Sequence, residues 1–177
     1  MIFLETPLRN VLVIEPERLE DDRGFFARTF ADDEFAARGL RTSFPQCSVS
    51  YNRKAGTIRG LHLQRPPHEE AKLVRCTAGA VFDVALDLRP ESPSYRRWFS
   101  VELTAKNGRM VYIPEGVAHG FQTLVDEAEL FYQISVRFDP ACATGVRWDD
   151  PSVGITWPRA DHRVMSERDR SFPDFRR

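Results

Sequence analysis

The sequence predicts an all-β protein, a sandwich or barrel with the double-sheet jelly roll among the candidates. Two observations support this fold class. Short apolar runs with a period of two recur along most of the chain, and turns rich in Gly, Pro, Asp and Asn separate them. Only one segment, 32–40, has a convincing helical pattern.

The strands are expected at fairly even spacing. In the clearest of them, 81–88, Asp83 and Asp87 fall on one face and the large apolar side chains fall on the other. That alternation is typical of a strand with one buried face. In chain order, the expected strands are 11–14, 24–30, 57–63, 72–76, 81–88, 98–103, 109–113, 120–124 and 129–136.

The helical segment 32–40 has recognisable ends. Asp32 or Asp33 can accept hydrogen bonds from the first turn, and Gly39 can end the helix in a left-handed conformation. From about residue 148 the chain is rich in Pro, Asp and Arg, and we expect it to wrap around the strands as irregular structure. A chain of 177 residues supports one core, so we expect a single domain over 1–177.

Composition excludes several classes of protein. The net charge is −1 and charges of both signs are mixed, so no basic stripe predicts a nucleic-acid partner. Cys47, Cys76 and Cys142 are odd in number and widely spaced, which favours neither a disulfide framework nor a C-x-x-C metal site and fits a reducing cytoplasm. The first residues include acids and no long apolar run, so we expect no signal peptide and no membrane span.

Four side chains with useful chemistry fall on strand faces that should point inward: His62, Lys72, His119 and Tyr132. Each has an ordinary structural explanation. His62 could be a hydrogen-bonded core histidine, and Lys72 could lie at a sheet edge with its ammonium group in water. Tyr132 could simply pack in the core, and His119 could cap a hairpin. Their convergence in a barrel wide enough for one small ligand favours a shared pocket instead.

The stretch IRGLHLQ, 58–64, raises a geometric question. Arg59 and His62 are an odd number of residues apart, so a regular strand would place them on opposite faces. Gly60 permits a bulge or twist that would bring them together. Alternatively, Arg59 reaches a ligand held by a partner subunit.

The histidines of the sequence could also be metal ligands. HLQRPPHEE and PEGVAH resemble the two histidine motifs of the cupin superfamily, whose metal-binding members carry a His-x-His pair, a Glu and one further His. Here Gln64 stands in place of the second histidine of that pair. We therefore expect no tight metal site, although His68 and Glu69 leave a weaker one open.

An ordered set of motifs extends the resemblance to most of the chain: DDRGFFARTF, GTIRGLHLQ, AKLVRCTAGAVFDVALDLRPESPSYRRW, YIPEGVAHGF, ELFYQIS and RWDDPSVGITWP. Over residues 23–169 the sequence resembles the dTDP-4-dehydrorhamnose 3,5-epimerase family. The resemblance implies a cupin-type double-stranded β-helix with a few short helices, and a homodimer that works without metal or organic cofactor. It also implies inversion of C3 and C5 of a dTDP-4-keto-6-deoxyhexose.

The resemblance assigns catalytic roles to four residues. His62 would be the base that removes the proton beside the ketone, and Lys72 would stabilise the enolate oxygen. Tyr132 would donate a proton from the other face of the sugar. Asp169 would orient His62, with Asp83 as a second candidate for that task, although a strand-surface charge is the ordinary explanation of Asp83.

Further residues match family positions that contact the sugar nucleotide. Guanidinium groups among them suit the oxygens of a diphosphate. The residues expected to bind substrate are Arg23, Phe26, Gln46, Ser48, Arg59, His119, Phe138 and Arg168.

The sequence departs from the family at Arg28, Phe138 and Ala143, where relatives commonly carry Glu, Tyr and Glu. These departures leave open an epimerase that inverts only C3. A metal-dependent cupin enzyme and a sugar-nucleotide-binding module without catalysis are further alternatives.

Overall fold

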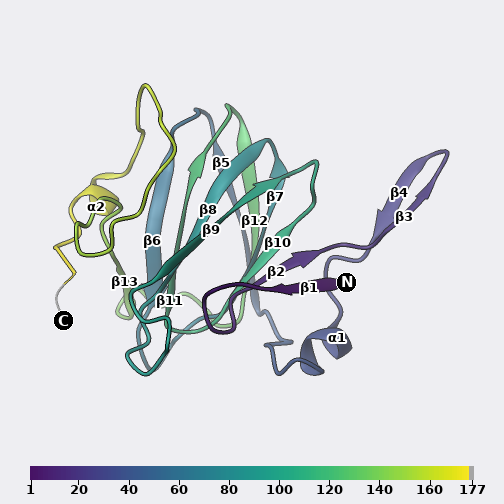
Figure 1. Cartoon of the computed structure of the whole chain (residues 1–177), viewed down its shortest axis with the longest axis horizontal. Coiled ribbons are helices and arrows are strands. Elements are labelled where there is room, and N and C mark those ends of the chain that lie inside the picture. The colour runs from purple at the N-terminus through teal and green to yellow at the C-terminus, as the bar shows by residue number, and fades with distance from the viewer. Residues whose placement is uncertain (176–177) are drawn as a thin grey trace.

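The computed structural model describes residues 1–175, whose strands form two antiparallel sheets and a separate hairpin (Figure 1). In spatial order, the six-stranded sheet contains β1 (Ile2–Glu5), β2 (Leu12–Glu15), β10 (Met110–Ile113), β7 (Lys72–Ala78), β12 (Ala128–Ile134) and β5 (Gln46–Asn52). The five-stranded sheet contains β13 (Ala143–Gly145), β6 (Ile58–Gln64), β11 (Val117–Thr123), β8 (Ala80–Asp87) and β9 (Trp98–Thr104). The hairpin pairs β3 (Arg18–Asp21) with β4 (Gly24–Ala27), and the helices are α1 (Asp32–Ala36) and α2 (Glu167–Arg170).

The main hydrophobic core lies between the two sheets. Val74 and Leu130 of the six-stranded sheet belong to the same buried cluster as Val81 and Phe121 of the five-stranded sheet. Each sheet therefore buries one face against the other, as strands of alternating polarity require. This arrangement confirms the predicted all-β, double-sheet architecture.

Two further apolar clusters cover the outer faces of the sheets. On the six-stranded sheet, Phe35 of α1 packs with Leu73 and Met110. On the five-stranded sheet, Trp157 of the carboxyl-terminal segment packs with Val84 of β8. In Figure 1 this segment, drawn in yellow, runs beside β6 and carries α2. It thereby places α2 next to β6, one wall of the space between the sheets.

All the expected strands overlap observed ones, with ends that differ by a few residues. Four strands were missed: β1, β3, β5 and β13. β1 and β3 expose most of their side chains, and β13 has 3 residues. In β5, small polar residues alternate with Cys47, Val49 and Tyr51, a pattern too weakly apolar to distinguish from a loop.

The expected helix is present but shorter than the sequence pattern. Its N-cap is Ala31, so the expectation that Asp32 or Asp33 is the N-cap is wrong. Each of these carboxylates nevertheless accepts a hydrogen bond from the next backbone N–H. The stop at Gly39 is confirmed, because Gly39 has a φ of +68° and the N–H of Leu40 bonds back to the carbonyl of Phe35.

The cysteines form no disulfide: Cys47, Cys76 and Cys142 are all free thiols. Cys47 is exposed and Cys76 is buried. Among residues 1–175, no helix has the length and apolar character needed to cross a bilayer.

Candidate active site

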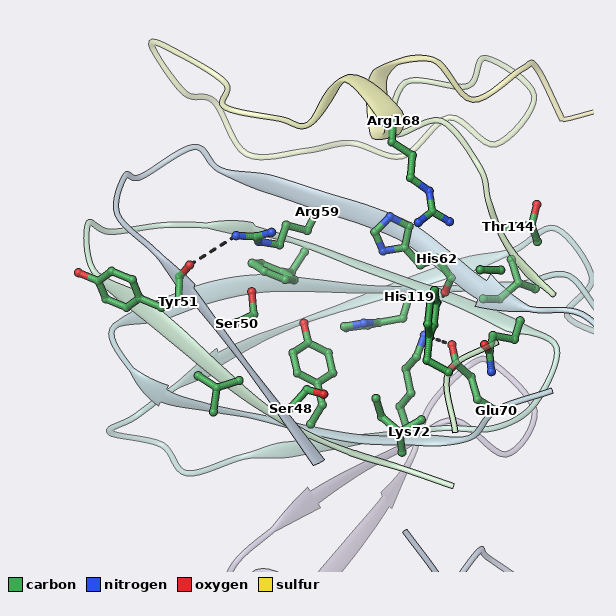
Figure 2. A pocket seen from close by; sticks show the side chains of 18 residues that line it. Ser48, Ser50, Tyr51, Arg59, His62, Glu70, Lys72, His119, Thr144 and Arg168 are labelled. Atoms are coloured by element: carbon green, nitrogen blue, oxygen red, sulfur yellow. Dashed lines mark hydrogen bonds and ion pairs between the residues drawn. The ribbon is translucent and has the colours of Figure 1, made fainter. Parts of the chain in front are cut away.

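A cavity of about 510 Å³ opens between the two sheets, with walls from β5, β7 and β12 on one side and from β6 and β11 on the other (Figure 2). It brings together most of the side chains selected from the sequence. Those that line it are Ser48, Arg59, His62, Lys72, His119, Tyr132, Phe138 and Arg168. Sequence positions more than a hundred residues apart thus meet in one space.

On the β6 wall, His62 is paired with a buried carboxylate. Its Nε2 lies 2.7 Å from Oδ1 of Asp169, whose residue is 4% exposed, while the imidazole itself is 39% exposed. Burial raises the pKa of Asp169, but the hydrogen bond and charge of His62 and the N–H of Gly60 bring the pKa below its usual value. Asp169 is therefore ionised and can only accept, so Nε2 carries the proton and Nδ1 is left as the basic nitrogen.

The position of Asp169 follows from a local helix cap. Ser166 caps α2, and its hydroxyl oxygen accepts a hydrogen bond from the N–H of Asp169. The carboxylate then reaches β6, where Oδ2 accepts a bond of 3.1 Å from the N–H of Gly60. One carboxylate thus holds both the imidazole of His62 and the backbone beside it.

An irregularity at Gly60 resolves the geometric question raised by the IRGLHLQ stretch. The pairing of β11 with β6 shifts register between His119 and Phe121, and Gly60 has a φ of +111°. A Cβ on Gly60 would lie 2.6 Å from Cα of Gly120, so no other residue fits. Because of this bulge, Arg59 and His62 both face the cavity.

On the opposite wall, Lys72 lies at the start of β7 as a buried ion pair. Its Nζ is 2.8 Å from Oε1 of Glu70, and both side chains are 9% exposed. The same ammonium donates to the carbonyl of His62 at 3.2 Å. The ammonium group of Lys72 therefore has a carboxylate partner. The other expectation, a lysine at a sheet edge with its ammonium group in water, is wrong because β7 is an inner strand. Figure 2 shows Glu70 and Lys72 below His62.

Tyr132 of β12 lines the cavity from the six-stranded sheet. Burial raises the pKa of its phenol well above the usual value, and the nearby charge of Asp83 adds to this, while Arg59 opposes it. The hydroxyl group therefore stays protonated at neutral pH. It is suited to donate a proton rather than to accept one.

His119 forms a second histidine–aspartate pair, much deeper than the first. Its Nε2 lies 2.8 Å from Oδ2 of Asp83, and their side chains are 4% and 1% exposed. The imidazole also packs edge-on against Tyr132, with ring centroids 5.8 Å apart. Both expectations for Asp83 are therefore wrong: it is neither a surface charge nor a partner of His62, because β8 pairs directly with β11 and aims it at His119.

Two guanidinium groups give the cavity positive charge. Arg59 donates to the amide oxygen of Asn52 at 2.7 Å and to the carbonyl of Tyr51 at 3.4 Å. Arg168 of α2 points toward His62 in Figure 2. Among residues 1–175, neither arginine forms an ion pair with a carboxylate, so both are available to an anion.

Three of the residues expected to bind substrate lie outside the cavity. Arg23 and Phe26 belong to the β3–β4 hairpin, which projects away from the sheets in Figure 1. Arg23 pairs with Asp21 at 2.6 Å, and Phe26 is 69% exposed. Gln46 instead supports the rim, because its side-chain oxygen accepts a hydrogen bond from the N–H of Phe138.

Sequence reasoning missed Glu70, which lines the cavity and pairs with Lys72. Its spacing of two residues from Lys72 was a usable signal, although Glu70 precedes the strand. His68, considered with Glu69 for a weaker metal site, does not line the cavity. In the described part of the chain, it forms a group of three ligand types with Asp139 and Cys142.

Comparison with known proteins shows which family the chain resembles. A family model described as dTDP-4-dehydrorhamnose 3,5-epimerase matches residues 5–177. The chain belongs to this family of isomerases. A relative named dTDP-4-dehydrorhamnose 3,5-epimerase, from Sinorhizobium fredii, is 39% identical over 98% of this chain and 89% of its own length. The family membership predicted from the sequence motifs is therefore confirmed.

Solved structures of epimerases share the whole fold. The dTDP-4-dehydrorhamnose 3,5-epimerase of Bacillus anthracis, with TDP and PPi bound, is 37% identical, with a TM-score of 0.94 over 98% of this chain and 99% of that chain. A 3′-monoepimerase from Streptomyces bikiniensis in complex with dTDP-quinovose is 32% identical, with a TM-score of 0.88 over 96% of this chain and 86% of that chain. These matches confirm the predicted cupin-type jelly roll.

Proposed function

We propose that this protein inverts C3 and C5 of a dTDP-4-keto-6-deoxyhexose by removing and returning protons beside the C4 ketone. The observation that carries the proposal is the arrangement of one cavity. A carboxylate-bound imidazole with a basic nitrogen, His62, lies on one sheet, and a protonated phenol, Tyr132, lies on the other. Family membership supports the same reaction class.

In this mechanism His62 acts as the base. Its Nδ1 takes the proton from C3, and the electron pair of the broken C–H bond moves toward the carbonyl to give an enolate. Asp169 stabilises the imidazolium that forms and keeps the ring in the required tautomer. Lys72, held by Glu70, supplies positive charge beside the developing oxygen anion.

Tyr132 completes the inversion. Its O–H group donates a proton to the carbon from the face opposite His62, and the enolate electrons form the new C–H bond. The imidazolium and the phenolate then return to their starting states by exchange with water. The same cycle at C5 gives the doubly inverted product. Each cycle removes one proton and returns one, so it needs no oxidant or reductant.

The nucleotide part of the substrate would occupy the arginine side of the cavity. Arg59 and Arg168 offer planar donors that suit diphosphate oxygens. The related Bacillus anthracis enzyme has been solved with TDP and PPi bound, which supports the choice of a thymidine diphosphate. Ser48 and Phe138 line the same cavity and would contact the rest of the ligand.

The direct test is deuterium uptake. Purified protein is incubated with dTDP-4-keto-6-deoxyglucose in deuterated water, and NMR follows the C3 and C5 positions. The proposal predicts deuterium at both carbons. Tight binding without exchange at either carbon would indicate a binding module. Exchange lost after treatment with a chelator and restored by a divalent metal would indicate a metal-dependent cupin enzyme.

A second candidate is an epimerase that inverts only C3. Phe138 and Ala143 line the cavity at positions where the family commonly carries a tyrosine and a glutamate, so polar contacts to the sugar are reduced. A relative of this fold, from Streptomyces bikiniensis, is a 3′-monoepimerase. Deuterium at C3 with none at C5 would favour this candidate over the double epimerase.

We infer that the active form is a homodimer. The projecting hairpin exposes Leu19 at 69%, Phe25 at 56% and Phe26 at 69%, which is unusual for a free surface. Arg23 and Phe26 are also far from their own cavity in the fold, although family resemblance makes them substrate ligands. A second copy of the chain resolves the conflict if each hairpin reaches the cavity of its partner.

Mixed dimers test this exchange. Phe26→Ala and His62→Ala should each be nearly inactive alone. When the two variants are unfolded together and refolded as an equal mixture, half of the dimers contain both chains and one complete site, so about a quarter of the wild-type activity should return. No recovery, or a monomer by light scattering, would contradict the homodimer.

We also propose that residues 1–177 form a single domain in the cytoplasm. The outer apolar clusters attach both α1 and the carboxyl-terminal segment to the same pair of sheets. Free thiols at Cys47, Cys76 and Cys142 fit a reducing compartment. A single cooperative unfolding transition, and fractionation of the native protein with cytoplasmic markers, would test the two statements.

A further inference from the structure

The proposed reaction assigns no role to the loop after β6, which carries His68. Its imidazole faces the turn after β12, where Asp139 and Cys142 lie. We propose that His68, Asp139 and Cys142 form a zinc site that cross-links these two loops beside the active-site cavity.

The distances among the three ligand atoms are close to those of a metal site. Nδ1 of His68 lies 2.6 Å from Oδ2 of Asp139, and Sγ of Cys142 lies 3.7 Å from the same oxygen. All three atoms lie within 4.8 Å of one another. Ligands at zinc distances of about 2.0–2.3 Å in a tetrahedron are roughly 3.3–3.7 Å apart, so side-chain adjustments of about 1 Å are enough.

The chemistry of the three ligands selects the metal. Thiolate, imidazole and carboxylate are a mixed set that suits Zn²⁺, whereas Mg²⁺ and Ca²⁺ prefer oxygen ligands alone. Cys142 binds as the thiolate and releases its proton to solvent. The two anionic ligands then balance the charge of a divalent ion, with water as the fourth ligand at this half-exposed position.

Buried contacts already fix the two loops. The side chain of Gln64, which is 2% exposed, donates to the carbonyl of His68 at 2.9 Å and accepts from the N–H of Asp139 at 2.6 Å. Oδ1 of Asp139 accepts from the N–H of Ala141, which leaves Oδ2 directed at the other two ligands. Ligand positions held in this way reduce the ordering cost of metal binding.

The position of the site connects it to the cavity. Phe138 precedes Asp139, Ala143 follows Cys142, and both of these neighbours line the cavity. Gln64 lines it as well. An ion bound at the three ligands would therefore stiffen one rim of the substrate cavity without touching the reacting atoms.

Metal binding can be measured without turnover, so the result does not depend on the proposed epimerase activity. Untagged full-length protein is stripped with a chelator and titrated with Zn²⁺ by calorimetry, and with Co²⁺ by absorption spectroscopy. We expect one Zn²⁺ per chain, a thiolate-to-Co²⁺ charge-transfer band, and no comparable binding of Mg²⁺. Zinc should also raise the thermal unfolding temperature.

Matched variants assign the ligands. Cys142→Ser and His68→Gln should each weaken zinc binding by more than about 10-fold, since loss of an outer-shell partner alone costs that much. Cys47→Ser removes an exposed thiol elsewhere and should leave binding unchanged. Thermal unfolding of each variant without metal reports whether it folds. The proposal is wrong if wild-type protein takes up no zinc, or if uptake persists undiminished in Cys142→Ser and His68→Gln.

Discussion

Two histidine–aspartate pairs with imidazoles that line the cavity have nearly equal lengths and very different surroundings. The pair of His62 with Asp169 spans 2.7 Å, and the pair of His119 with Asp83 spans 2.8 Å. The first imidazole is 39% exposed and opens on the cavity, whereas the second is 4% exposed. The same two side chains thus serve different purposes, and access to the ligand distinguishes them.

The two histidines also have different roles in the proposed reaction. His62 has a free nitrogen on the base side of the cavity, while His119 packs against Tyr132 on the acid side. In the proposed mechanism, the buried pair therefore shapes the surroundings of the proton donor, and the accessible pair exchanges protons with the sugar. Substitutions at the two pairs should separate these functions.

The largest effect is expected at the exposed imidazole. His62→Ala removes the base and should slow deuterium uptake at C3 by about 1,000-fold, in the range for loss of a general base. Binding of dTDP, measured by calorimetry, should change little. His162→Ala, which removes an exposed histidine far along the chain, serves as the control. Equal losses in His62→Ala and His162→Ala would contradict the assignment.

The next effect is expected at the orienting carboxylate. Asp169→Asn keeps the shape of the side chain but no longer favours the tautomer with a basic Nδ1. Because the base itself remains, the exchange rate should fall by roughly 100-fold, the lower end of the range for general base catalysis. The Michaelis constant should stay close to that of the wild type, because Asp169 does not line the cavity. A fall in affinity with an unchanged rate would show that Asp169 supports substrate binding instead.

At the buried pair, the main expected effect is on stability. Asp83→Asn weakens a buried histidine–aspartate hydrogen bond and should lower the free energy of unfolding by about 2 kcal/mol. Chemical denaturation gives this value directly. The rate per folded molecule should fall far less than in His62→Ala. If Asp83→Asn were fully stable yet inactive, the two pairs would share the catalytic work.

The smallest effect concerns acid. Because the pKa of Asp169 is lower in the folded protein, its ionised form stabilises the fold at neutral pH. That contribution is present above its usual value of 3.8 and disappears as the pH falls through the lowered pKa. Unfolding free energies measured from about pH 6 to about pH 3 should therefore decline less steeply for Asp169→Asn than for wild type. Parallel curves would contradict a lowered pKa of Asp169 in the folded protein.

Much of the site was accessible from sequence because strands alternate. Lys72 and Tyr132 share phase with buried neighbours, so their inward direction follows from the period of two. The period of two does not predict side-chain direction where a strand is irregular. Whether Arg59 joins His62 depends on the bulge at Gly60, which the sequence permits but does not require.

Partners that come from distant segments were less predictable. Asp169 was placed by family resemblance, since no local pattern links α2 to β6. Asp83 was misassigned because its partner depends on which strand lies next to β8, and the pairing with β11 places it opposite Phe121 and beside His119. Cys142 and His68 likewise meet only through the arrangement of two loops.

Tyr132→Phe tests most directly whether protons leave and return on opposite faces of the sugar. The variant keeps His62 and Asp169 but lacks the hydroxyl group on the other wall. In deuterated water, NMR should detect deuterium at C3 of the substrate at a substantial rate, with the original configuration retained and no inverted product. Inverted product formed at the wild-type rate, or exchange and inversion abolished together in a folded variant, would contradict the account.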